Sequence, residues 1–333
     1  MILKHAILHI LDQAAGQLFL SQNELDINQN QVHEYLEKLI TKFNQGDFKP
    51  GQLNGDDYLA QQLDDNQQGD FVTISQGLTE KLFDVIKELS AVPGGDVLIL
   101  EYTEENDDFF ALFKINPAPR FVHMVDYQDE CVQNQLVLNQ AVLPSGSSAP
   151  DEGIIVNLMD GRYRLIEKTY RQEGQRLAYF AERFAALEPE VSIKNELQTV
   201  KQAVKQVADK FDVPLHEALA TTQAMIFEDA SEDGIISVDR IGEQVFDDNL
   251  SAQTMYREKL EESAINHQIE LEDPLKYQKK YAAQKFILDS GIEVSIPMAA
   301  YQDKNQVELI NNPDGKITLM IKGIDEIKNK FKA

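Results

Sequence analysis

The stretch "GGDVLILEYTEENDDFFALFKI", residues 94–115, contains two apolar runs separated by an acidic segment. Valine, isoleucine, leucine and phenylalanine dominate both runs, and these residues favour β-strands. Thr103 to Asp108 between them is polar, as expected of a turn. Two similar runs follow in "FVHMVDY", residues 121–127, and "NQLVLNQAVL", residues 134–143. The stretch therefore predicts an antiparallel sheet, and we expect helices on one of its faces.

The residues before this sheet predict one hairpin and two helices. The runs "HAILHILD", residues 5–12, and "GQLFLSQNELD", residues 16–26, have strand character and are separated by a short polar segment. Apolar residues then recur at helical spacing from Val32 to Phe43 and from Leu78 to Leu89. Pro93, Gly94 and Gly95 follow the second run and predict its end.

The segment "PSGSSAPDEG", residues 144–153, has the composition of a flexible linker. The strand-like run "GIIVNLMDGRYRLIEK", residues 153–168, lies beyond it. We therefore interpret 144–153 as a flexible loop inside a first α+β domain, residues 1–169.

After Thr169 the pattern becomes helical. Leu177 to Phe184 predict one helix and Val200 to Phe211 another, and Pro214 is placed to begin a third. Strand patterns return in residues 283–324, where "ELINNPDGKITLMIKGI", residues 308–324, reads as a hairpin with a packed apolar face of Ile310, Ile317, Leu319 and Ile321. The predicted fold is α+β: an N-terminal antiparallel sheet with flanking helices, then a helical region, residues 170–333, closed by C-terminal strands.

Charge is distributed unevenly along the chain. The full sequence has 31 basic and 56 acidic residues, a net charge of −25. Residues 1–273 carry a net charge of −28, whereas residues 274–333, with 10 basic and 7 acidic residues, carry +3. A strongly acidic surface repels nucleic acid and anionic lipid. Any direct contact with DNA is therefore expected after Pro274.

The sequence contains no recognisable catalytic, metal or cofactor signature. Its single cysteine, Cys131, excludes an internal disulfide and a cysteine-rich zinc site. His5 and His9 lack the glutamate of a zinc-protease helix, and Gly94 and Gly95 lack the lysine of a phosphate loop. We predict no catalytic residue, no metal and no cofactor. No apolar run reaches the roughly 18 residues that span a bilayer, so a cytoplasmic protein without membrane contact is expected.

Several segments, in their order and spacing, carry a resemblance to a known family. They are "AILHILD" (6–12), "LFLSQNELD" (18–26), "GQRLAYFAERF" (174–184), Lys285-Phe286, Gly291-Ile292 and "GKITLMIKG" (315–323). On these segments the chain resembles the bacterial nucleoid-associated proteins of the NdpA/YejK type. The resemblance implies a non-enzymatic protein located at the nucleoid, which binds DNA directly or reaches it through other nucleoid proteins.

Lysines near the C-terminus are the candidate DNA contacts. Lys316 and Lys322 flank the second strand of the predicted hairpin, and Lys328 and Lys330 follow in the tail. The tail lysines fit either a phosphate-contacting patch or a solvated helix end. Two other functions stay open: a protein-interaction scaffold without DNA contact, and an enzyme with an unrecognised site. A homo-oligomer is compatible with each of them.

Overall fold

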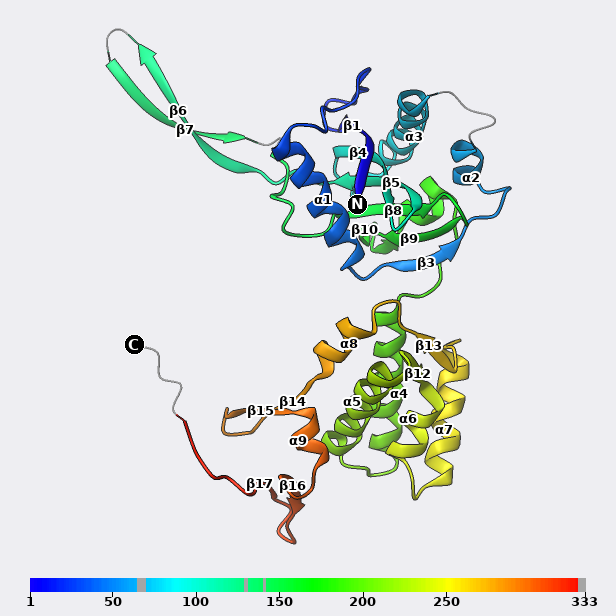
Figure 1. Ribbon diagram of the computed structural model, residues 1–333, viewed down its shortest axis with the longest axis vertical. Coiled ribbons are helices and arrows are strands. Elements are labelled where there is room, and N and C mark those ends of the chain that lie inside the picture. The colour runs from blue at the N-terminus through cyan, green and yellow to red at the C-terminus, as the bar shows by residue number, and fades with distance from the viewer. Residues whose placement is uncertain (65–69, 129–130, 140–141, 329–333) are drawn as a thin grey trace. The chain divides into compact units, whose positions relative to one another are not determined.

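The structure, a computed structural model, describes residues 1–64, 70–128, 131–139 and 142–328. The chain divides into two compact units, unit 1 (Met1–Ser192) and unit 2 (Ile193–Ala333). The predicted α+β class is confirmed, because unit 1 holds an antiparallel sheet and unit 2 holds helices followed by strands (Figure 1).

Unit 1 is built on one large sheet. Within the described residues its strand order is β2-β1-β4-β5-β8-β9-β3, and neighbouring strands are antiparallel. The elements are β1 (Ile2–Asp12), β2 (Gln17–Phe19), α1 (Asn30–Asn44), β3 (Lys49–Gln52), α2 (Tyr58–Leu63), α3 (Phe71–Ile86), β4 (Gly95–Glu104), β5 (Asp107–Ile115), β6 (Arg120–Gln128), β7 (Cys131–Asn139), β8 (Glu152–Asn157), β9 (Arg162–Ile166), β10 (Tyr170–Gln172), β11 (Gln175–Leu177) and the π-helix η1 (Phe180–Ala185).

The quoted stretch forms the central hairpin β4–β5 of this sheet. Its turn residues Glu105 and Asn106 both have positive φ, 53° and 76°, the backbone that a two-residue hairpin turn requires. The register pairs Tyr102 with Phe109, whose rings stack with centroids 5.2 Å apart. The turn and the cross-strand pair thus fix which residues face each side of the sheet.

Helices cover both faces of the sheet, so the expectation of helices on one face is wrong. Ile7, Val97, Ile99, Phe110 and Leu112 pack on one face with residues of α2, α3 and η1. The next residues along the same strands pack on the other face with α1. The physical reason lies in the strands themselves. They are apolar at consecutive positions instead of alternate ones, and such strands are stable only when both faces are buried.

The segment from 170 to 192 belongs to unit 1. Leu177 to Phe184 were expected to form a helix, but residues 175–177 are strand β11 and a six-residue π-helix follows. Tyr179, Phe180 and Phe184 are fully buried in the same core as α3. Glu190 and Ser192 also bond back to the Asp47–Pro50 region, where Ser192 donates to Asp47 at 3.1 Å. The division between the units therefore follows Ser192, beyond the expected boundary at Thr169.

The loop 144–151 passes over helix α1 before β8 begins at Glu152. Gly146 and Pro150 are buried. Gly146 has φ +72°, and a Cβ added there lies 3.4 Å from the ring of Tyr35. The loop 144–151 thus connects two strand pairs across the surface of unit 1, although its serines and prolines give it the composition of a linker.

Strands β6 and β7 pair with each other and form a two-stranded sheet of their own. Figure 1 shows them as a ribbon separate from the main sheet. The expected strand character of residues 121–127 and 134–139 is thus found, but not in the predicted sheet. Residues 140–141 lie outside the described residues, and 142–143 are not in a strand. The side chain of Cys131, which begins β7, lies outside the described part of the structure.

A buried ion pair lies beneath η1. The Lys114 ammonium on β5 is 3.2 Å from a carboxylate oxygen of Glu152 on β8, and both side chains are fully buried. Tyr179 donates a hydrogen bond of 2.7 Å to the same carboxylate, and Lys114 donates one of 2.7 Å to Asn116. Burial lowers the pKa of Lys114 and raises the pKa of Glu152, and each charge offsets part of the other's shift.

His9 on β1 is a buried titratable side chain whose contacts define its charge. The Ser21 amide donates to His9 Nδ1 at 3.0 Å, so Nε2 carries the proton and donates to Ser75 Oγ at 3.0 Å. Burial lowers the pKa of His9 from 6.5 to about 4. The folded protein therefore holds His9 neutral.

This geometry predicts that acid destabilises unit 1 through His9. The unfolded chain takes up a proton below pH 6.5 and the folded chain does not until about pH 4, so stability falls as the pH falls through this window. Between pH 7 and pH 5 the loss is about 2 kcal/mol. Urea unfolding should show this loss in the wild type and not in His9→Gln. The exposed His123→Gln serves as the control, and an equal loss in all three proteins contradicts the assignment.

Unit 2 packs helices around a single core. Tyr256 of α7 is buried at its centre and donates to the carbonyl of Val238 at 3.1 Å. The absence of a side chain at Gly242 leaves room for this ring. A Cβ added at 242 would lie 2.2 Å from a ring atom of Tyr256, which is too close. The elements are α4 (Ile193–Lys210), α5 (Leu215–Glu232), β12 (Ile235–Ser237), α6 (Val238–Val245), α7 (Leu250–Glu262), β13 (Gln268–Glu270), α8 (Pro274–Tyr281), β14 (Ala283–Ile287), β15 (Glu293–Pro297), α9 (Met298–Gln302), β16 (Val307–Asn311) and β17 (Ile317–Ile321).

The C-terminal hairpin β16–β17 forms as expected, but its packed face differs from the prediction. Val307 is buried, whereas Ile317 and Ile321 are about half exposed. The register places Val307 opposite Ile321 and Asn311 opposite Ile317, so only the start of β16 reaches the helices. The sequence pattern identified the strands correctly and overestimated their burial.

Candidate nucleic-acid interface

The lysines proposed from the sequence lie in the C-terminal part of unit 2, and two of the three described ones are paired with acids. Lys322 forms an ion pair with Glu308 on the neighbouring strand and donates to the carbonyl of Lys304 at 3.2 Å. Lys328 lies 3.2 Å from Glu326. Lys316 is exposed at the β16–β17 turn, and Lys330 lies outside the described residues. Among the three described lysines, the structure therefore brings no two together as free cations.

A second group of lysines lies earlier in the chain, on α8 and β14. Residues 274–288, here named the basic segment, contain Lys276, Lys279, Lys280 and Lys285 and no acidic residue. Their local charge is thus +4 in a chain whose net charge is −25. Asp273 and Asp289 flank the segment on both sides. A charge count over residues 274–333 averages this cluster with seven acidic residues and so does not single it out.

Helix α8 presents these charges from a fixed anchor. It begins at Pro274, and the Asp273 carboxylate caps it by accepting from the Lys276 amide at 3.1 Å. Tyr277 is buried in the core of unit 2, so Lys279 and Lys280 in the last turn are exposed. Lys280 lies 5.1 Å from the ring centroid of Tyr281, a cation–π contact that holds the ammonium near the surface. No ion pair of Lys279, Lys280 or Lys285 is found among the described residues.

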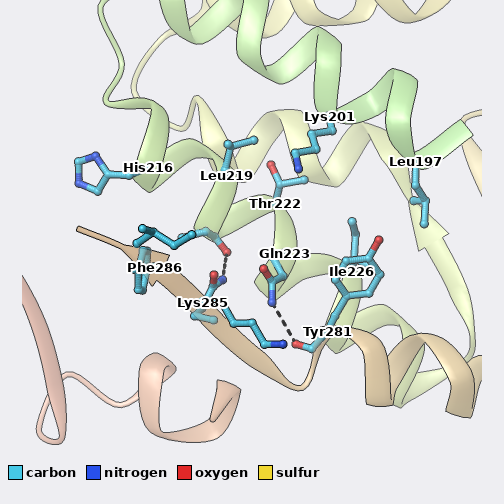
Figure 2. Close-up of a pocket in the computed structure, with 13 residues that line it drawn as sticks. Leu197, Lys201, His216, Leu219, Thr222, Gln223, Ile226, Tyr281, Lys285 and Phe286 are labelled. Atoms are coloured by element: carbon cyan, nitrogen blue, oxygen red, sulfur yellow. Dashed lines mark hydrogen bonds between the residues drawn. The ribbon is translucent and has the colours of Figure 1, made fainter. Parts of the chain in front are cut away.

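A surface pocket of about 350 Å³ adjoins the basic segment (Figure 2). Its walls come from α4, α5 and β14, and its charged lining residues are Lys201 and Lys285. His216 also lines it, and no aspartate or glutamate does. Gln223 donates to the carbonyl of Ala283 at 2.8 Å, and Gln284 donates to that of Ala220 at 2.8 Å. These two hydrogen bonds from side-chain amides hold β14 against α5, and they fix Lys285 at the rim of the pocket.

The site has the features of an anion contact. Lysines supply charge to phosphate oxygens without defining a base sequence. Glu217, whose Oε1 lies 3.6 Å from His216 Nε2, does not line the pocket. In the described ranges, no group of three histidine, cysteine, aspartate or glutamate residues is arranged to hold a metal ion. Across the same ranges, no helix is long and apolar enough to span a bilayer.

A family model described as "Nucleoid-associated protein YejK" matches residues 7–330. Comparison with curated proteins gave no match. The matched range includes both units, the basic segment and the C-terminal hairpin.

Proposed function

The chain belongs to the nucleoid-associated protein family described as YejK, and from this premise we propose that it is a non-catalytic chromosome-associated protein of the cytoplasm that contacts DNA weakly through unit 2. The observation that carries the proposal is the basic segment, residues 274–288. It is anchored to the core by Tyr277 and presents lysines that have no acidic neighbour within the segment.

The physical case rests on phosphate contacts. Lys279, Lys280 and Lys285 provide ammonium groups at the surface of one helix and the adjoining strand. Lys316 adds a fourth charge from the hairpin, whereas Lys322 and Lys328 are already paired with Glu308 and Glu326. Lysine contacts to the duplex backbone bring no sequence preference. The expected binding is therefore weak, independent of sequence and sensitive to salt.

A salt titration of DNA binding tests this proposal. Each phosphate contact contributes about −0.9 to the slope of log K against log salt, so three or four lysines give a slope of about −3 to −4. Replacing Lys279, Lys280 and Lys285 by glutamine should bring the slope about 3 closer to zero. Replacing Lys316, Lys322 and Lys328 should change it by only about 1, because two of these three lysines are paired.

A matched control separates local contact from total charge. Lys38, Lys42 and Lys87 lie in unit 1, and their replacement by glutamine removes the same number of charges. This control should keep the wild-type slope. If the unit 2 variant behaves like the control, direct binding through the basic segment is wrong. Association with the chromosome then occurs through another protein, as in the scaffold alternative.

A further inference from the structure

The pocket between α4, α5 and β14 has an apolar lining that a DNA contact does not use. Phosphate and sugar groups of a duplex backbone offer no apolar group that could cover such a lining. The pocket volume of about 350 Å³ lies within the range of small-molecule sites, about 300–1,000 Å³. The lining therefore indicates a ligand with an apolar body. Its larger apolar side chains are Leu197, Leu219, Ile226, Tyr281, Phe286 and Ile287.

Two cations accompany this apolar lining. Lys201 extends from α4 and Lys285 from β14, and both side chains are exposed (Figure 2). No aspartate or glutamate lines the pocket, and no ion pair of Lys201 or Lys285 is found among the residues that the structure describes. The two positive charges therefore have no counter-charge within the lining, although the chain as a whole has a net charge of −25. Charge complementarity thus favours a ligand that carries an anionic group.

His216 adds a polar atom that lacks a partner. It lies in the first turn of α5 and lines the same pocket. Its Nε2 is buried and makes no hydrogen bond within the described part of the chain, since Glu217 Oε1 at 3.6 Å is beyond hydrogen-bond distance. Buried polar atoms are stabilised by a hydrogen-bond partner. With the proton on Nε2, a carboxylate oxygen of a ligand supplies the acceptor that this nitrogen lacks.

We propose that this pocket binds a small organic acid, a carboxylate carried on an apolar body. The ammonium groups of Lys201 and Lys285 contact the carboxylate, and the apolar body lies against side chains such as Leu219 and Phe286. At roughly 30 Å³ for each water-sized group, the pocket holds about a dozen non-hydrogen atoms. A medium-chain fatty acid has this size. The inference goes beyond the proposed contact with DNA, and it is tested without DNA.

The walls of the pocket are held in place by bonds within unit 2. Thr222 Oγ1 donates to the carbonyl of Ala218 at 2.8 Å inside α5. The side-chain amides of Gln223 and Gln284 donate across to β14 and α5, as described above. These polar side chains therefore join the walls to one another, and Lys201, Lys285 and His216 remain to bind the anionic group. A site with fixed walls loses little conformational entropy when a ligand enters it.

Titration of the full chain with octanoate, followed by amide NMR spectra, tests the proposal. Octanoate should shift signals of residues 216–226 and 281–287, with a Kd on the order of 1 mM. Lys201→Gln should raise this Kd about tenfold, because the contact between an ammonium and a carboxylate is lost. Lys205→Gln removes the same charge one turn further along α4, outside the pocket lining, and should leave the Kd unchanged. Circular dichroism melting checks that both variants are folded.

Three further probes separate the parts of the ligand. Butyrate has a shorter chain, 1-octanol has no charge, and inorganic phosphate has no apolar body. Each should bind at least about tenfold more weakly than octanoate.

Three results overturn the proposal. Octanoate may shift no signal of the pocket residues, or Lys201→Gln and Lys205→Gln may change its Kd equally. Alternatively, phosphate or 1-octanol binds as tightly as octanoate, which shows that the pocket recognises a bare anion or an apolar group alone. None of these results changes the salt test of DNA binding, because Lys201 lies outside the basic segment.

Discussion

A chain that ends at Thr169 should fail to fold, whereas one that ends at Ser192 should fold on its own. The longer fragment corresponds to unit 1. The shorter one lacks Tyr179, Phe180 and Phe184, which are fully buried in the core on the α3 face of the sheet. Removing one buried phenylalanine side chain costs about 3–5 kcal/mol. Three such losses, about 9–15 kcal/mol, are comparable with the total stability of a typical domain, about 5–15 kcal/mol.

Expression of the two fragments measures this difference directly. Residues 1–192 should give a cooperative thermal transition, and residues 1–169 should give none. Phe184→Ala in the full chain is a milder version of the same test. It should lower the free energy of unfolding by about 3–5 kcal/mol. A folded 1–169 fragment contradicts the assignment of η1 to the core of unit 1.

Replacing Lys114 by methionine should destabilise unit 1 by about 3–5 kcal/mol, because the Glu152 carboxylate is then buried without its cation. Tyr179 still donates to that carboxylate, but one hydrogen bond does not offset the lost ion pair. Glu152 then stays protonated in the folded protein, whereas the unfolded chain ionises it above its ordinary pKa of 4.5. The folded state binds more protons, so the destabilisation grows as the pH rises above this value.

The double variant Lys114→Met with Glu152→Gln provides the control for this prediction. It removes both charges and keeps an acceptor for Tyr179, so most of the lost stability should return. Chemical unfolding at an acidic and a neutral pH compares the wild type with both variants. If the single variant is as stable as the double one at neutral pH, the pair contributes little and the buried carboxylate finds another partner.

Periodicity predicted the elements whose burial depends on local pattern. Residues 32–43 lie within α1, and residues 200–210 form the second half of α4, which begins at Ile193. The runs at 96–102 and 109–115 lie within β4 and β5. The α+β class follows from these elements. The number of covered faces was predicted incorrectly, although the consecutive apolar residues of β4 and β5 contain the information.

The sequence did not predict η1 correctly because its backbone depends on contacts across the unit. Leu177, Phe180, Ala181 and Phe184 have the spacing of an α-helix. Pairing of β11 with β10 takes Leu177 into a strand, and the following aromatic residues turn into the core in a six-residue π-helix. Ala186, with φ +54°, then ends the segment.

For the candidate DNA contacts too, the sequence predicted one part and the fold decides the other. Sequence alone located the lysines and the excess positive charge after Pro274. Pairing between Lys322 and Glu308 arises from the β16–β17 register, which joins residues 14 positions apart. The basic segment was recognisable from a shorter window of charge, since no acid lies between Asp273 and Asp289.

Strand β3 gives unit 1 a particular order of assembly. It is made early, yet it pairs with β9, and Lys49 binds Glu167, which follows 118 residues later. During synthesis the first half of the sheet must therefore wait for the second, and long-range strand pairing is slow. The helices of unit 2 contact elements that lie closer along the chain than β3 lies to β9, so they should form faster once they emerge. The ribosome thus synthesises the slow-folding unit 1 first. The sheet of unit 1 can close during the time that the synthesis of unit 2 takes.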